Sequence, residues 1–412
     1  MIHGPVEQGN PILGPCLGED VADVIIDRAF ADREPLGDLL VGEPFGHQLD
    51  DLDFPLRELV HNASSDEWPG SGHGVTVGSA LWFAVQDDGS VCGDGLRLQR
   101  ALASGRFVVT AEVTPPRGGD PLRTLEAARA LRGWVDAVNV TDGSRAVMRM
   151  SSLAVCCLLQ REGLEPVLQM ACRDRNRIAL QADLLGAHAL GLRNVLCLTG
   201  DPVRAGDQPN ARPVNELESV RLLRMVQQLN QGLDPVNGAL PDGPTALFAG
   251  AAADPQSPSW AGLRTRVRRK AEAGARFLQT QMVTDLDALR RFIDEIAAPL
   301  DLPVLAGVFL LKSARNAAFI NRVVPGANIP QVLIDRLAIA ADPATEGIAI
   351  AAEQVNAYRE VAQGVHLMAI KAEERIPAIL RQAGLTAGAG SAGDLAQGEV
   401  GAQQLGHGLL LG

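Results

Sequence analysis

Short apolar runs recur along the central part of the chain, and an amphipathic segment follows each of them. The runs are rich in β-branched residues, and most begin about 30 residues apart, which is typical of strands that alternate with helices. Each run predicts a buried strand of a parallel sheet. The runs cover 107–113, 136–141, 166–171, 194–199, 245–251, 277–281, 303–308 and 365–370.

The intervals between these runs have helical periodicity, and glycines that suit a helix C-terminus precede several runs, as Gly133, Gly163 and Gly191 do. Strand and helix alternate eight times over about 280 residues, which predicts a (β/α)8 TIM barrel over residues 101–386. A doubly wound open sheet is the alternative. The intervals before the fifth and eighth runs are longer and leave room for extra loops or a helix. The predicted helices cover 122–131, 151–161, 176–190, 217–230, 263–273, 286–296, 314–323 and 348–362.

The two ends of the chain differ from this pattern. Residues 1–100 hold 18 acidic residues against 5 arginines and no lysine, which gives a net charge of −13. We interpret them as an acidic, weakly structured extension that contains Gly and Pro. Residues 387–412 hold 8 glycines and are interpreted as a flexible tail.

Composition and charge limit the classes of function. The net charge of −12 argues against nucleic acid as the main partner. No apolar run reaches the roughly 20 residues that span a bilayer, and no basic segment precedes an apolar stretch at the N-terminus, so we expect a cytoplasmic protein. The six cysteines form no CxxC pair, and the sequence contains no HExxH, GxSxG or P-loop motif. We therefore predict no metal site; His188 falls inside a helix, and His366 near the start of the eighth run, away from the catalytic rim.

Polar side chains follow the strands of the predicted barrel at the points where the strands end. Because the active site of such a barrel lies at the carboxyl ends of its strands, these side chains should converge on one rim. A carboxylate at the end of an apolar strand, such as Glu112, is costly unless it is paired or used. Only three lysines occur against 34 arginines, and two of the three end strands. The residues on this rim are Glu112, Asp142, Gln169, Asp201, Gln281, Lys312 and Lys371.

Taken together, the strand ends resemble those of the methylenetetrahydrofolate reductase family, from about residue 106 to 385. The order and spacing of the motifs on successive strands carry the resemblance, and the later segments look closer to short bacterial forms of one-carbon and acetogenic metabolism. The motifs are Glu112-Val-Thr-Pro-Pro116, Val138-Asn-Val-Thr141, Cys172-Arg-Asp-Arg-Asn176, Asn194-Val-Leu-Cys-Leu-Thr-Gly-Asp-Pro202 and Lys270-Ala-Glu-Ala-Gly274 with Gln279-Thr-Gln281.

The resemblance implies a flavoenzyme that reduces 5,10-methylenetetrahydrofolate to 5-methyltetrahydrofolate, with FAD, or FMN as the alternative, and NADH or NADPH as the electron donor. Glu112 matches the general acid, and Asp201 matches the aspartate beside flavin and folate. Gln281 matches the pterin-binding glutamine, and Arg375 is assigned to the folate site. The flavin-contacting positions are Thr141, Asp142, Gln169, Thr199, Gly200, Asp201 and Lys270. Relatives also suggest a homo-oligomer or a cysteine-rich iron–sulfur and zinc partner subunit.

The sequence departs from the enteric form of the family at several positions. Gln169 replaces a histidine, Ala314 replaces an aromatic residue, and the fifth run lacks the tyrosine and histidine that contact flavin and nicotinamide. Two alternatives stay open. One is a non-catalytic folate-binding or scaffold subunit of a one-carbon complex, which the loss of the residues that contact nicotinamide favours. The other is a different barrel flavoenzyme of the proline dehydrogenase type, against which Glu112 and the Thr199-Gly-Asp-Pro202 motif argue.

Overall fold

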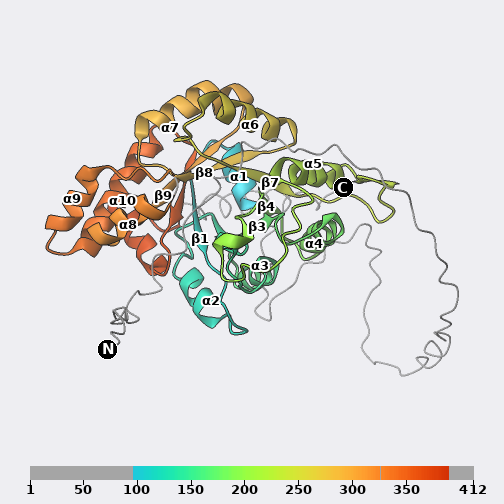
Figure 1. Cartoon of the computed structure of the whole chain (residues 1–412), viewed down its shortest axis with the longest axis horizontal. Coiled ribbons are helices and arrows are strands. Elements are labelled where there is room, and N and C mark those ends of the chain that lie inside the picture. Colours follow the sequence, from blue (N-terminus) through green and yellow to red (C-terminus); the bar gives the residue numbers. More distant parts are fainter. Residues whose placement is uncertain (1–95, 325, 389–412) are drawn as a thin grey trace, which may run out of the picture. The chain divides into compact units, whose positions relative to one another are not determined.

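The apolar runs form a closed barrel of eight parallel strands within the part of the chain that this computed structural model describes, residues 96–324 and 326–388 (Figure 1). The strand order is β1-β10-β9-β8-β7-β4-β3-β2, and β1 pairs with both β2 and β10, which closes the sheet. The predicted (β/α)8 barrel is confirmed, and the open sheet is wrong. The barrel strands are β1 (Val108–Val113), β2 (Ala137–Val140), β3 (Pro166–Ala171), β4 (Asn194–Leu198), β7 (Phe248–Ala253), β8 (Phe277–Met282), β9 (Val304–Phe309) and β10 (Gly364–Met368).

Helices surround the barrel and include all eight that the periodicity predicts, together with three that it does not, within residues 96–388. The unpredicted helices are α1, α9 and α11. The two long intervals are filled by α9 and by a small hairpin, β5 (Leu233–Asp234) with β6 (Gly238–Ala239). The α-helices are α1 (Arg97–Ala103), α2 (Leu122–Arg129), α3 (Ser152–Arg161), α4 (Arg177–Ala189), α5 (Ser219–Asn230), α6 (Trp260–Glu272), α7 (Leu286–Phe292), α8 (Ala314–Val323), α9 (Gln331–Ile339), α10 (Pro343–Arg359) and α11 (Ile376–Gln382).

Helix α1 packs against the lower part of the barrel interior. Its Leu98 is fully buried and belongs to an apolar cluster with inward-facing strand residues such as Phe277 and Leu305. The carboxylate of Glu165 accepts hydrogen bonds from the backbone N–H groups of Arg97, at 2.7 Å, and Leu98, at 2.9 Å, and so fixes the start of the helix. The predicted boundary between residues 100 and 101 falls inside this helix, because a helix as short as α1 leaves little periodic signal. Residues 1–95 of the predicted extension and 389–412 of the predicted tail lie outside the described residues.

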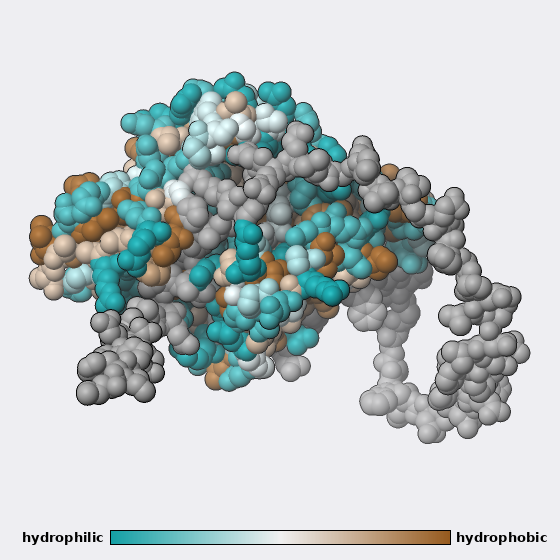
Figure 2. All heavy atoms as spheres, viewed as in Figure 1, coloured by the Kyte–Doolittle hydropathy of each residue, from teal (hydrophilic) through white to brown (hydrophobic). Residues whose placement is uncertain are grey.

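Helix α9 carries two large apolar side chains that are exposed. Val332 and Ile339 of α9 are 62% and 85% exposed, and Figure 2 shows apolar residues gathered in the region of α8 and α9. None of the helices in the described ranges is long and apolar enough to cross a membrane.

Candidate functional site

A cavity of about 130 Å³ opens at the carboxyl ends of the barrel strands. It gathers residues from β1, β3, β4, β7, β8 and β10 and from the loop after β2, which are far apart in the sequence, because all parallel strands of a barrel end on the same face. Seven of the residues that the sequence predicts for the site line this cavity. They are Glu112, Thr141, Asp142, Gln169, Gly200, Asp201 and Gln281.

Glu112 lies next to a histidine that the sequence interpretation placed away from the rim. The Glu112 side chain is 14% exposed, and its Oε2 atom lies 3.5 Å from Nε2 of His366, which is completely buried. The Oγ1 atom of Thr110 lies 3.0 Å from Nδ1 of the same imidazole. His366 faces the barrel interior because it has the same parity along β10 as the lining residue Met368. The alternation of residues along the strand could have predicted that His366 faces inward. Its proximity to Glu112 follows only from the pairing of β1 with β10.

Asp201 follows β4 and holds the turn that follows β2. Its Oδ2 atom accepts a hydrogen bond of 2.5 Å from the backbone N–H of Arg145. Arg145 has a φ of 57°, and the preceding Gly143 has a φ of 54°, so this turn has an uncommon left-handed backbone that the aspartate stabilises. Asp201 therefore combines a negative charge at the cavity with control of the neighbouring turn.

The carboxyl group of Asp142 lines the cavity and also binds neighbouring protein groups. It accepts a hydrogen bond of 2.8 Å from the backbone N–H of Ala171 and pairs with Arg175. The other side of the Arg175 guanidinium lies 2.9 Å from Asp183. Burial raises the pKa of Asp142, and the positive charge of Arg175 opposes that shift. These contacts tie the ends of β2 and β3 together.

Gly200 allows a close approach between the loop after β4 and the end of β3. Its φ is +92°, and a Cβ atom there would lie 3.0 Å from the Cβ of Arg173 and 3.1 Å from that of Ala171. Only glycine adopts this conformation without strain. Arg173 lines the cavity with a side chain that is 5% exposed and that pairs with Asp174 at 2.6 Å. The sequence interpretation quoted this arginine in a motif but gave it no role.

Two glutamines of β8 bring amide groups to the interior. Gln281 lines the cavity, and Gln279 below it accepts a hydrogen bond of 2.7 Å from the Nδ2 atom of Asn139. Two buried polar atoms nearby are unsatisfied: among the described residues, Asn139 Oδ1 and Thr141 Oγ1 have no hydrogen-bond partner. Buried polar atoms are normally satisfied, so those beside the cavity indicate a place for a polar ligand or water.

Three residues predicted to contact flavin or folate do not line the cavity, and neither do the two lysines predicted for the rim, Lys312 and Lys371. Lys270 lies on α6, where its Nζ atom donates a hydrogen bond of 2.8 Å to the backbone oxygen of Ala252. Thr199 Oγ1 accepts a hydrogen bond from the backbone N–H of Ser219, at 3.2 Å. Arg375 follows β10 in the short helix η6 (Glu373–Arg375). Their predicted contacts with flavin or folate stay predictions.

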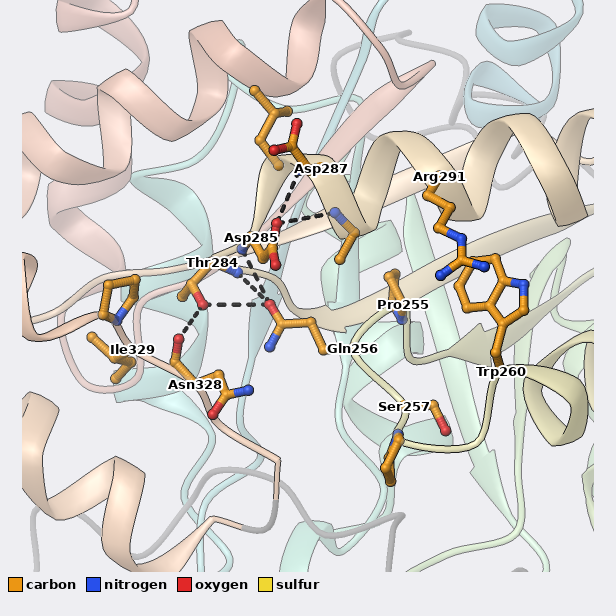
Figure 3. Close-up of a pocket in the computed structure, with 14 residues that line it drawn as sticks. Pro255, Gln256, Ser257, Trp260, Thr284, Asp285, Asp287, Arg291, Asn328 and Ile329 are labelled. Carbon is orange, nitrogen blue, oxygen red and sulfur yellow. Dashed lines mark hydrogen bonds between the residues drawn. The ribbon is translucent and has the colours of Figure 1, made fainter.

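A second hollow, of about 880 Å³, lies beside the loops that follow β7 and β8 (Figure 3). Gln256 is at its centre, and the Gln256 Oε1 atom accepts hydrogen bonds from the backbone N–H groups of Thr284, at 2.7 Å, and Asp285, at 3.2 Å. The guanidinium of Arg291 stacks on the ring of Trp260, 4.2 Å from its centroid. None of the predicted site residues lines this hollow, and its central amide connects two loops, so we place the candidate chemistry in the smaller cavity.

Neither hollow has the ligands of a metal centre. In residues 96–324 and 326–388, no group of three or more His, Cys, Asp and Glu side chains gathers as a metal site would require.

Comparison with known proteins finds relatives that share one name, methylenetetrahydrofolate reductase. The family model for methylenetetrahydrofolate reductase matches residues 97–384. A probable methylenetetrahydrofolate reductase (NADPH) of Caenorhabditis elegans is 24% identical over 58% of this chain and 36% of its own length. The 5,10-methylenetetrahydrofolate reductase of Salmonella typhimurium is 23% identical over 54% of this chain and 71% of its own length. The chain thus spans little more than a third of the nematode relative.

The fold also matches a solved structure. An uncharacterized protein from Clostridium thermocellum, which binds two copies of 5-methyl-5,6,7,8-tetrahydrofolic acid, superposes with a TM-score of 0.52 at 13% identity, over 70% of this chain and 98% of that one. At this identity the likeness concerns the fold alone. The family model, in contrast, covers the whole barrel from α1 to α11. The chain therefore belongs to the methylenetetrahydrofolate reductase family.

Proposed function

We propose that this chain reduces 5,10-methylenetetrahydrofolate to 5-methyltetrahydrofolate, using a bound flavin that NADH or NADPH reduces. The observation that carries the proposal is the convergence of Glu112, Asp201 and Gln281 on one cavity at the carboxyl end of the barrel. These three side chains match the acid, the anionic group and the pterin ligand of the family. The relatives named as reductases support the same reaction.

The residues around the cavity fit a flavin. Thr141 offers a buried hydroxyl with no partner among the described residues, and Gly200 keeps the adjoining backbone free of a side chain. The Nη1 atom of Arg145 is also buried and has no hydrogen-bond partner in residues 96–324 and 326–388, and its charge suits a phosphate group. Those three residues would hold the cofactor, which we propose is FAD. When bound, a flavin supplies the two-electron acceptor and donor that hydride transfer requires.

The side chains of the cavity have separate tasks in this reaction. Opening of the five-membered ring of the substrate requires a proton, and Glu112 donates it to the nitrogen that leaves the methylene carbon. The ring-opened folate is a cationic iminium, and the negative charge of Asp201 at the cavity stabilises it. The amide of Gln281 both donates and accepts hydrogen bonds, as recognition of a pterin edge requires.

A non-catalytic folate-binding subunit is the second candidate. It is favoured by β7, which contributes only the methyl group of Ala252 to the cavity lining. The folate-binding Clostridium thermocellum protein shows that a related fold can bind this ligand class. A flavoenzyme of the proline dehydrogenase type has no support from the family model. A homo-oligomer and a cysteine-rich partner subunit stay predictions.

The visible spectrum of the purified chain separates the two candidates. A reductase should be yellow, lose its colour with NADH or NADPH under anaerobic conditions, and regain it with methylenetetrahydrofolate. A colourless protein that binds folate without turnover would favour the binding subunit.

The variant Glu112→Gln tests the assigned acid. Glutamine keeps the size of the side chain but cannot give up a proton, so folate reduction should slow by at least about 100-fold while flavin reduction is nearly unchanged. Stopped-flow measurement of each half-reaction gives both rates. Glu126→Gln, on the exposed face of α2, is the control. Equal losses in both half-reactions would contradict the role of Glu112 as the acid.

A further inference from the structure

The barrel interior below the cavity contains a histidine for which the proposed reaction has no task. The imidazole of His366 is fully buried between β1 and β9; Thr110 is its partner in register on β1, and Gly307 is its partner on β9. Its Nε2 atom has no hydrogen-bond partner among the described residues and lies 3.5 Å from Oε2 of Glu112. A buried imidazole with an unsatisfied nitrogen beside the assigned acid requires an explanation.

The contacts of Thr110 indicate which nitrogen of the imidazole carries hydrogen. The hydroxyl of Thr110 donates to the backbone oxygen of Val365, at 3.4 Å, so its oxygen is available to accept from Nδ1 of His366, at 3.0 Å. A neutral imidazole has one N–H group. With the hydrogen on Nδ1, the Nε2 atom that faces Glu112 is a bare acceptor.

A bare nitrogen and a carboxyl group face each other favourably only when a proton lies between them. An ionised carboxylate beside a bare nitrogen would leave two acceptors without a donor in a buried site. The separation of 3.5 Å is longer than a good hydrogen bond, and contacts of catalytic groups commonly shorten when substrate binds.

We propose that Glu112 and His366 form a pair that shares one proton, and that His366 is a positioning residue that keeps this proton available for the substrate. The proposal rests on the proposed function and adds a residue to it. When the methylene C–N bond breaks, its electron pair stays on the ring nitrogen, which takes the proton from Glu112. The pair is left as a carboxylate and a neutral imidazole, and one proton from solvent restores it.

The surroundings of the pair determine how it regains its proton after the reaction. Only Glu112 reaches the cavity, because its side chain is 14% exposed whereas that of His366 is 0% exposed, so the solvent proton enters through the carboxyl group. Glu373 of η6 is a further ionisable group that interacts electrostatically with Glu112. Burial raises the pKa of Glu373, and Glu374 and Glu112 add smaller contributions in the same direction.

Nitrogen NMR of the full chain labelled with ¹⁵N-histidine tests the arrangement without requiring activity. His366, assigned by its loss in His366→Gln, should show a protonated Nδ1 and an acceptor-type Nε2, and the Nε2 signal should shift in Glu112→Gln. His188 is an internal control, because its Nδ1 accepts from the backbone N–H of Ala246, at 3.2 Å, and so should show the opposite pattern with no response to Glu112→Gln. A bare Nδ1 and protonated Nε2 on His366 would overturn the proposal, because Glu112 would then be held as a carboxylate.

The pH profile of the folate half-reaction is the second readout. In His366→Gln the alkaline fall in rate should move to lower pH by about one unit, which corresponds to the loss of one hydrogen bond that favours the protonated pair. His188→Gln should leave the profile unchanged. A working His366→Gln enzyme with the wild-type profile would also overturn the proposal. If wild-type protein reduces no folate, the proposed function fails, and the NMR result alone decides on the pair.

Discussion

Replacing Asp201 by asparagine tests whether a single charge at the cavity drives the folate reaction. The carboxylate accepts a hydrogen bond of 2.5 Å from the backbone N–H of Arg145, and the carboxamide oxygen of asparagine can accept the same bond. The substitution therefore removes the negative charge and keeps the shape of the turn after β2. Two consequences of different size are expected.

The larger consequence concerns the rate. Losing one preorganised electrostatic group typically slows a reaction by 100- to 1000-fold, or about 3 kcal/mol of transition-state stabilisation. The smaller consequence concerns the turn. A hydrogen bond to a neutral acceptor is weaker than one to a charged acceptor by about 1 kcal/mol at most. Folate reduction should therefore slow at least about 100-fold, whereas flavin affinity should change by less than about fivefold.

Single-turnover measurement of folate reduction, with a flavin titration beside it, gives both quantities. Asp207→Asn is a matched control, because Asp207 also follows β4 and accepts from the backbone of the same loop, at 2.9 Å from the N–H of Met148, but does not line the cavity. That variant should keep the wild-type rate. The reasoning is refuted if Asp201→Asn reacts at the wild-type rate, or if both variants slow equally.

Three further predictions concern stability, cofactor binding and reactivity. Leu98→Ala should lower the free energy of unfolding by about 3 kcal/mol in urea titrations, because Leu98 fills the lower barrel interior. For the same reason, a chain that begins at residue 104 and lacks α1 should be less stable than one that begins at residue 96. Gly200→Ala should weaken flavin binding, because a side chain at a φ of +92° is strained, and a titration that gives wild-type affinity would contradict this. Burial is the main cause that raises the pKa of Cys172 to about 12, so iodoacetamide at about pH 8 should leave this thiol unmodified in the folded chain and alkylate it in urea, as mass spectrometry can show.

Local sequence determined the elements of this protein and most of the cavity. The apolar runs and the periodic segments between them encode strands and helices through interactions over a few residues, so the barrel could be predicted from them. The position of a residue at a strand end then placed Glu112, Asp201 and Gln281 on one face, because parallel strands in a barrel share their carboxyl end. The same rule failed for Lys312 and Lys371, which follow strands but do not line the cavity; the Nζ atom of Lys312 instead donates a hydrogen bond to the backbone oxygen of Ile370.

Only the tertiary structure decided which side chains meet. Thr110 and His366 are separated by 256 residues, yet barrel closure makes β1 and β10 neighbours and brings the imidazole to Glu112. Helix α1 was not predicted either, because a short helix gains its stability from the burial of Leu98 inside the barrel rather than from its own periodicity. Contacts of this kind depend on the register and closure of the sheet, which arise from the packing of the whole chain and are not encoded in any single segment.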